Sequence, residues 1–145
     1  MAQTGSRNDP FAGFNFLVEI DGITVAGFSE VTGLINETDV IEYRTGNNDI
    51  SVTKLPGLKK FNNITLKHGM TDNTDFWEWR KTVLNGKTER KSGSIVLQTE
   101  ARTEAMRWNF FEAWVRKLEV SAFNAKTNDV ALLTVEIVCE RVELV

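Results

Sequence analysis

Side chains that could perform chemistry are scarce in this sequence. His68 is the only histidine and Cys139 the only cysteine, which argues against a zinc site built from several nitrogen and sulfur ligands. No Gly-x-Ser-x-Gly motif accompanies His68, so we interpret it as a surface histidine at a strand end. Cys139 follows the apolar run 135–138 and is predicted to be a small core residue.

Glycines and carboxylates do not define a site either. Gly13, Gly22, Gly27 and Gly33 match neither a Gly-x-Gly-x-x-Gly motif nor a P-loop, and we interpret them as turn and bulge glycines. The 20 acidic residues could include a catalytic pair, but a linear sequence does not give the separations between carboxylates. The sequence therefore predicts no catalytic residue, no cofactor and no metal.

The length and charge restrict the class of protein. With 145 residues the chain suits one domain, residues 1–145, whose first ten residues form a flexible polar arm. A net charge of −3 lacks the basic surface expected of a specific nucleic-acid binder. Residues 1–10 lack the apolar segment of a secretory leader, no later segment has membrane-spanning length, and a lone cysteine fits a reducing cytoplasm.

The elements that must position any site are mainly strands. Apolar and polar residues alternate over 14–20, and Asp21-Gly22 predicts a two-residue type I′ turn that pairs Ile20 with Ile23 and Val18 with Val25. Further strands are predicted at 40–43, 64–67, 94–99, 106–111, 117–122 and 130–142.

One helix interrupts the strands. Asp75 is the predicted cap, with Glu78 at capping-box spacing and Asn85-Gly86 as the stop. Phe76, Trp79 and Val83 fall on one helical stripe that would lie on a sheet. The predicted fold class is mainly β, a β-sandwich or barrel with one packed α-helix.

Residues 44–60 form a long stretch between two predicted strands. It contains Gly46, Pro56 and Gly57 and is either a long loop or a ribbon. Connections of this length usually have a function, so the segment is either an interaction loop or a mobile surface loop.

Several stretches are distinctive through their order and spacing along the chain: residues 10–11, 14–20, 26–34, 41–44, 46–47, 54–58, 64–67, 69, 76–80, 108–110, 113–114 and 128–130. Together they resemble the inner tube proteins of contractile tails, a family that includes tubes of phage tails, R-type tailocins and extracellular contractile injection systems. His68, Val115 and Cys139 depart from the family's usual residues, and these departures bear on the subfamily.

The resemblance implies a structural subunit that is not an enzyme. Such subunits form hexameric rings stacked into a hollow tube, with the sheath protein, baseplate and terminal cap proteins as partners and cargo or a tape-measure protein in the lumen. It further implies assembly in the bacterial cytoplasm, as part of a virion or an injection apparatus. The expected contacts between subunits and rings come from Thr45, Gly46, Asn47, Asn48, Asp49, Lys54, Leu55, Pro56, Gly57 and Leu58.

Two other functions compete with this interpretation. A β-sandwich that binds carbohydrate could present Trp77, Trp79, Trp108 and Trp114 to a sugar, although tryptophans more often fill cores. A small hydrolase could use a carboxylate pair. Formation of rings or rods by the purified protein distinguishes the tube subunit from both.

Overall fold

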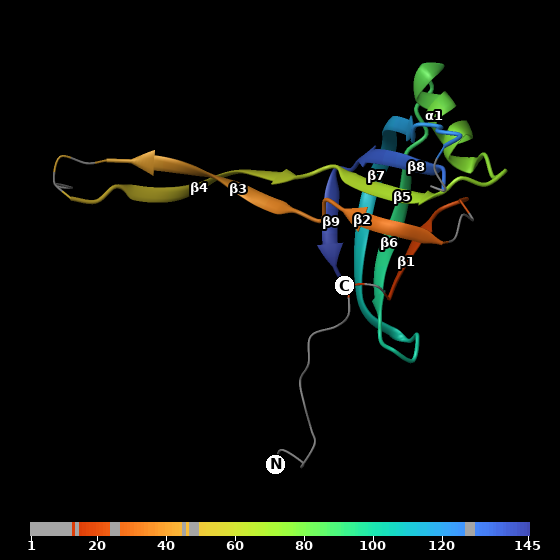
Figure 1. The fold of residues 1–145 in the computed structure, drawn as a ribbon. Coiled ribbons are helices and arrows are strands. Elements are labelled where there is room, and N and C mark those ends of the chain that lie inside the picture. Colours follow the sequence, from red (N-terminus) through yellow and green to blue (C-terminus); the bar gives the residue numbers. More distant parts are fainter. Residues whose placement is uncertain (1–12, 14, 24–26, 45, 47–49, 127–129) are drawn as a thin grey trace, which may run out of the picture.

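A computed structural model describes residues 13, 15–23, 27–44, 46, 50–126 and 130–145. Most of these residues lie in strands, and one helix packs on them (Figure 1). The elements are β1 (Phe16–Ile20), β2 (Phe28–Thr32), β3 (Asn36–Tyr43), β4 (Thr53–Phe61), β5 (Ile64–Gly69), α1 (Asp75–Leu84), β6 (Lys91–Gln98), β7 (Glu104–Val120), β8 (Leu132–Val138) and β9 (Arg141–Leu144). The predicted fold class, mainly β with one helix, is confirmed.

The body is a sheet that folds over itself around strand β7. Its order is β1-β6-β7-β8-β5-β2, with β9 also paired to β7 and all the pairs antiparallel. The 17-residue β7 pairs with β6 along its first part and with β8 along its last part. At Glu112, between these parts, φ is 54°, a left-handed conformation that bends the strand. One long strand therefore connects the two layers.

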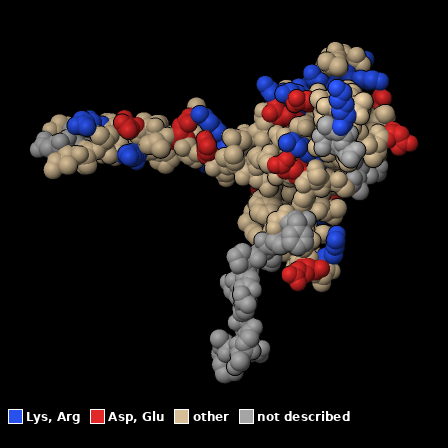
Figure 2. Space-filling model, viewed as in Figure 1, with Lys and Arg blue, Asp and Glu red and all other residues tan. Residues whose placement is uncertain are grey.

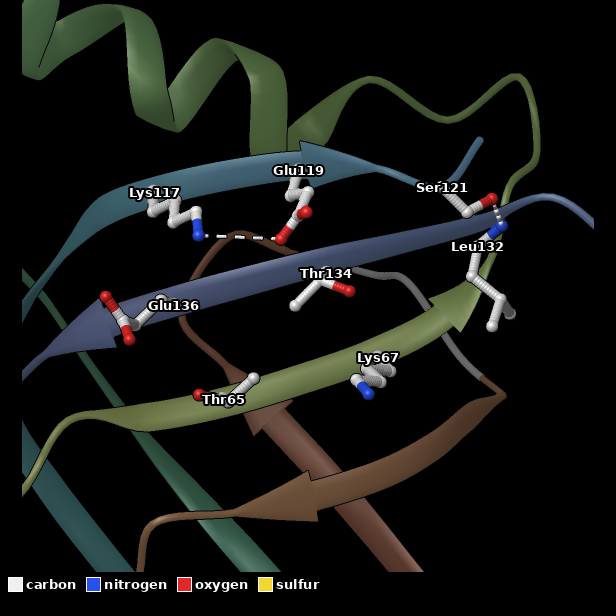
Figure 3. A pocket seen from close by; sticks show the side chains of 8 residues that line it. All are labelled: Thr65, Lys67, Lys117, Glu119, Ser121, Leu132, Thr134 and Glu136. Atoms are coloured by element: carbon white, nitrogen blue, oxygen red, sulfur yellow. Dashed lines mark hydrogen bonds and ion pairs between the residues drawn. The ribbon is translucent and has the colours of Figure 1, made fainter. Parts of the chain in front are cut away.

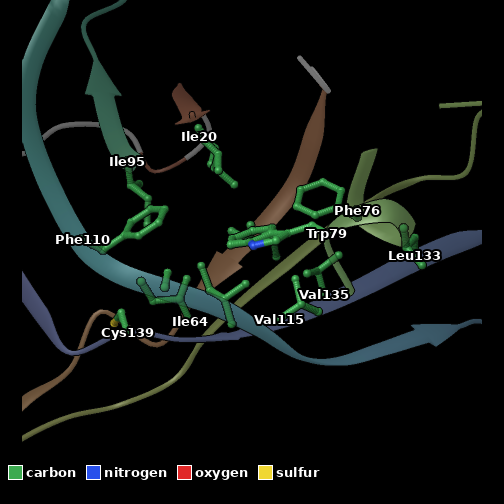
Figure 4. Packing of buried hydrophobic residues seen from close by; sticks show 14 residues of the cluster. Ile20, Ile64, Phe76, Trp79, Ile95, Phe110, Val115, Leu133, Val135 and Cys139 are labelled. Carbon is green, nitrogen blue, oxygen red and sulfur yellow. The ribbon is translucent and has the colours of Figure 1, made fainter. Parts of the chain in front are cut away.

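The core lies between these layers. In β5 and β8 every second side chain is buried, as the period of two requires. The buried set includes Ile64, Leu66, Phe110, Val135 and Ile137 (Figure 4). Helix α1 adds Phe76 and Trp79, whose relative exposures are 1% and 2%. Helix and sheet therefore share one hydrophobic core.

Strands β3 and β4 leave the body as a separate two-stranded ribbon. They pair only with each other and project far beyond the other elements (Figure 1). Of residues 44–60, those from Thr53 onward belong to β4, so the ribbon alternative is the one the structure adopts and the connection is only residues 44–52. The alternative of a loop that reaches residue 60 is not adopted, because the register pairs Tyr43 with Thr53 and β4 continues to Phe61.

The base of the ribbon is fixed to the body. Ile35 N–H donates to the Gly33 carbonyl over 2.7 Å, and Asn62 N–H donates to the Ile35 carbonyl over 3.2 Å. Gly33 has a φ of 99°, and a side chain there would collide with the backbone of Asn63. Only glycine fits this corner.

The predicted hairpin after β1 is only partly correct. Ile20 and Ile23 form a bridge, but β1 pairs with β6 along its whole length. Gly22 has a positive φ of 74° whereas Asp21 does not, so the turn is not the type I′ that the sequence predicted. The Val18–Val25 pair lies outside the described residues. Burial of Val18 and Ile20 against β6 explains the alternation equally well.

Three other boundaries differ from the prediction. Segment 106–111 and residues 117–120 of segment 117–122 belong to one strand, β7, whose bend at Glu112 interrupts the alternation. Segment 130–142 is divided into β8 and β9 by Cys139 and Glu140, because the paired strand β7 bends beside them. Thr74, not Asp75, is the residue before the helix, and its side chain makes no cap hydrogen bond; instead Asp75 N–H donates to Asn73 Oδ1 over 2.9 Å.

His68 is buried, which corrects its interpretation as a surface residue. It shares the core face of β5 with Ile64 and Leu66 and has 2% exposure. Its ring lies 5.4 Å from the Phe28 ring and 5.7 Å from the Phe76 ring, centroid to centroid. Nδ1 donates to the Gly69 carbonyl over 2.8 Å, and Nε2 has no hydrogen-bond partner in the part of the chain that the structure describes.

Two neighbouring tryptophans on α1 allow a matched test of the core. Trp79 is buried and donates its Nε1–H to the Glu89 carbonyl over 2.7 Å, whereas Trp77 is 36% exposed. We expect Trp79→Ala to lower the free energy of unfolding by about 3–5 kcal/mol, because it leaves a large cavity. Trp77→Ala should lower the free energy of unfolding much less in the same urea titration. Equal losses would contradict the packing of α1 described above.

Two strand glycines test the close approach of β1 to β6. A Cβ on Gly93 would lie 2.5 Å from both the Glu19 carbonyl oxygen and Phe110 Cζ, whereas one on Gly69 meets only Val130 Cγ1 at 3.8 Å. We expect Gly93→Ala to destabilise the fold by about 1–3 kcal/mol through overpacking. Gly69→Ala is the control and should leave the thermal midpoint nearly unchanged. A midpoint for Gly93→Ala equal to that of the control would show that the strands do not approach so closely.

Candidate interaction surface

The ribbon exposes apolar side chains that a monomer has no reason to expose. Register pairs Ile41 with Leu55 and Tyr43 with Thr53, and the register shift beside Val40 sets Gly57 and Leu58 together opposite Asp39, which lies on the same face as Ile41. These apolar residues are 51% (Ile41), 54% (Tyr43), 47% (Leu55) and 76% (Leu58) exposed. We call Ile41, Tyr43, Leu55 and Leu58 the apolar face of the ribbon. Contiguous exposed apolar surface is typical of protein–protein contacts.

The opposite face of the ribbon is more polar. It carries Thr38, Glu42, Lys54 and Lys59, together with the apolar Val40. Figure 2 shows acidic and basic side chains along the ribbon with uncharged surface between them. The two faces therefore differ in their polarity.

One ion pair joins the two strands near the ribbon's base. Lys60 Nζ lies 2.9 Å from an oxygen of Asp39, and this hydrogen bond raises the pKa of Lys60. Both side chains are about half exposed, so the pair adds little to stability. Lysines and a register shift after Thr38 are also features by which natural edge strands avoid indiscriminate pairing.

The residues expected to make contacts divide into two groups. Lys54, Leu55, Pro56, Gly57 and Leu58 all lie in β4, on the ribbon. Gly46 is described as part of a turn between β3 and β4. Thr45, Asn47, Asn48 and Asp49 lie outside the described residues, as does the N-terminal arm 1–10. The strand predicted at 40–43 is the last part of β3, where Ile41 and Tyr43 alternate with charged residues, whereas the first part of β3 was not predicted.

The outward face of β5, β7 and β8 is polar. It forms a shallow hollow of about 450 Å³ lined by residues such as Lys67, Lys117, Glu119 and Glu136 (Figure 3). Lys117 lies 3.5 Å from Glu119, and Arg116 pairs with Glu136. Because these charges pair within the chain, the face has little excess of either sign.

The structure provides no cluster of His, Cys, Asp and Glu that could hold a metal ion among its described residues. It also contains no helix, within those residues, that is long and apolar enough to cross a membrane. The tryptophans do not form a sugar-binding platform, since Trp79 is buried and Trp77 lies on α1 while Trp108 and Trp114 lie on β7. The carbohydrate-binding alternative is not supported.

A bent, open β-sheet with one packed helix and a projecting hairpin defines the architectural class of this protein. The family described as T4-like virus tail tube protein gp19 matches residues 12–143. The chain therefore belongs to the tail tube protein family, as the sequence resemblance indicated.

Solved structures agree with this assignment. A chain of the extended PVC sheath-tube complex, an extracellular contractile injection system, is 30% identical, with a TM-score of 0.84 and coverage of 94% of this chain and 91% of that chain. A chain of the tube-terminating cap of the anti-feeding prophage is 29% identical, with a TM-score of 0.88 and coverage of 100% and 99%. Hcp1 of Flavobacterium johnsoniae shares the fold alone, at 16% identity and a TM-score of 0.54, with coverage of 88% and 94%. A search of curated protein sequences found no match.

Cys139 offers a test of burial beside the β8–β9 break. The thiol is 6% exposed, and desolvation raises its pKa above the ordinary value. Because the thiolate is the reactive form, we expect slow labelling by a thiol reagent at pH 8 in the folded protein and rapid labelling in urea. Val130→Cys in a Cys139→Ala background, at a position 72% exposed, should label rapidly when folded. Equal rates for the two folded thiols would contradict burial of Cys139.

Proposed function

We propose that this protein is the structural subunit of the inner tube of a contractile injection particle or phage tail, and that it performs no catalysis. Copies form closed hexameric rings that stack into a hollow tube within the bacterial cytoplasm. The observation that carries the proposal is the ribbon of β3 and β4, which exposes Ile41, Tyr43, Leu55 and Leu58 outside the body in a chain of the tail tube family.

A two-stranded ribbon is marginally stable in water by itself. With eight and nine residues in its strands, this ribbon is about 26 Å long at ~3.3 Å per residue. It has no core of its own, so burial of its apolar face in an assembly would stabilise it. A contact of this kind, between different patches on identical subunits, can close into a ring.

The partners of the tube follow from the relatives. The similar chains come from a sheath-tube complex and a tube-terminating cap, and a chain of the anti-feeding prophage baseplate shares the fold. We therefore extend the proposal to contacts with a sheath protein, a baseplate and a cap. A polar face such as that of β5, β7 and β8 suits solvent or a passing cargo better than it suits packing between subunits.

Two adjacent residue pairs on the ribbon provide a matched test of assembly. Ile41 pairs with Leu55 on the apolar face, and Glu42 pairs with Lys54 on the opposite face. We expect Ile41→Ser/Leu55→Ser to stay folded and monomeric, because the substitutions remove apolar contact area without touching the core. Glu42→Ser/Lys54→Ser should still form rings or rods.

Negative-stain microscopy and size-exclusion chromatography give the readout, and circular dichroism checks folding of each variant. A wild-type protein that stays monomeric at every concentration, and is absent from the central tube of the native particle, would refute the proposed function. Rods of normal length from Ile41→Ser/Leu55→Ser would refute the role of the apolar face alone.

A further inference from the structure

The folded sheet does not close, and its two ends leave an open gap. Strands β1 and β2 are the two ends of the strand order and do not pair with each other. Between them runs a groove of about 250 Å³, lined by residues that include Phe16, Val31, Leu34, Leu97 and Trp108. We call the groove lined by these five residues the seam.

Two further hollows adjoin the seam and extend it. A second hollow of about 390 Å³ shares Phe16 and continues toward Phe28, and a third of about 140 Å³ shares Leu34 and Trp108 and ends at Leu144. Leu34 and Leu144 are 38% and 57% exposed. The seam is therefore an elongated apolar groove that is open to solvent and flanked by a sheet edge.

Two acidic side chains beside the seam already have partners, whereas Arg102, which lines the second hollow, forms no ion pair within the described residues. Glu30 on β2 lies 3.2 Å from Lys67, and Glu19 on β1 lies 3.0 Å from Arg107. Arg107 Nη2 also lies 2.7 Å from Glu104 Oε1. The hydrogen bonds to Glu104 and Glu19 raise the pKa of Arg107. An occupant of the seam therefore needs apolar surface and strand-like backbone more than it needs charge.

The ribbon has these properties. Its apolar face presents Ile41, Tyr43, Leu55 and Leu58, and within the described residues the outer edges of β3 and β4 pair with no other strand. An extended segment that lies along a sheet edge gains main-chain hydrogen bonds and side-chain contacts together. The ribbon of the same molecule does not fill the seam, because it projects away from the body (Figure 1).

We infer that the seam of one copy receives the apolar face of the ribbon from a second copy of this chain. The inference rests on the proposed function and specifies which two surfaces form the contact between neighbouring subunits. Ribbon and seam are different patches, so every copy both donates a ribbon and accepts one. Such a head-to-tail contact closes into a ring when the rotation between neighbours permits.

Thiol cross-linking in assembled particles tests this inference. In a Cys139→Ala background, Leu34→Cys places a thiol in the seam and Leu55→Cys places one on the apolar face. A short bismaleimide added to rods of this variant should give a ladder of covalent multimers in denaturing electrophoresis.

Two controls share one thiol each with the test variant. Leu34→Cys/Lys54→Cys moves the ribbon thiol by one residue to the opposite face, and Lys117→Cys/Leu55→Cys moves the other thiol to the polar sheet face. Both controls should remain a monomer band. If Leu34→Cys impairs folding, Leu144→Cys at the end of the same groove takes its place.

The outcomes separate the two proposals. Rods without a ladder, or ladders of equal intensity in the controls, would overturn the seam as the acceptor and leave the tube function intact. A wild-type chain that forms no rods under any condition and is absent from the central tube of the native particle would overturn the tube function and the inference with it. A ladder confined to the seam–ribbon pair would support both.

Discussion

Unpaired strand edges are the constraint on which this structure depends. A sheet that does not close leaves backbone donors and acceptors at its margins, and they must find partners or water. Here the margins are β1 and β2 in the body and the outer edges of β3 and β4 in the ribbon. In a solitary molecule these margins would invite disordered aggregation, whereas in an ordered assembly they provide directional contacts between copies.

The body is arranged so that these margins stay in place. Strand β7 runs through both layers, and its bend at Glu112 turns one sheet over the core. Helix α1 then covers core residues through Phe76 and Trp79, and Arg80 donates to the Val115 carbonyl over 3.0 Å. The helix is therefore attached to β7 by core packing and by a hydrogen bond, while β1 and β2 join the body through β6 and β5.

Sequence patterns predicted the parts of the fold that depend on local periodicity. The alternation in β5, the stripe of Phe76 and Trp79 on α1, and the core position of Cys139 were all confirmed. Sequence patterns failed where burial or strand length depends on residues that are far away in the sequence. His68 is buried because Phe28 and Phe76 enclose it, and β7 is a single strand because its neighbours change from β6 to β8 along its length.

The contact residues remain a prediction. Family resemblance and the unusual length of segment 44–60 led to the choice of Lys54 to Leu58, and the sequence left open whether that segment is a loop or a ribbon. Pro56 and Gly57 disfavour a regular strand, and they lie at the register shift, where Pro56 pairs with Val40 and Gly57 approaches Asp39. The seam had no sequence signal at all, since its residues come from strands that are far apart in the chain.

The corner at Gly33 has a consequence for how copies recognise one another. Hydrogen bonds through Ile35 and Asn62, together with the tight approach of Gly33 to Asn63, fix the direction in which the hairpin leaves the body. These contacts limit the directions that the hairpin can take. A preorganised arm loses little conformational entropy on docking, and more of the contact energy remains to hold neighbours together.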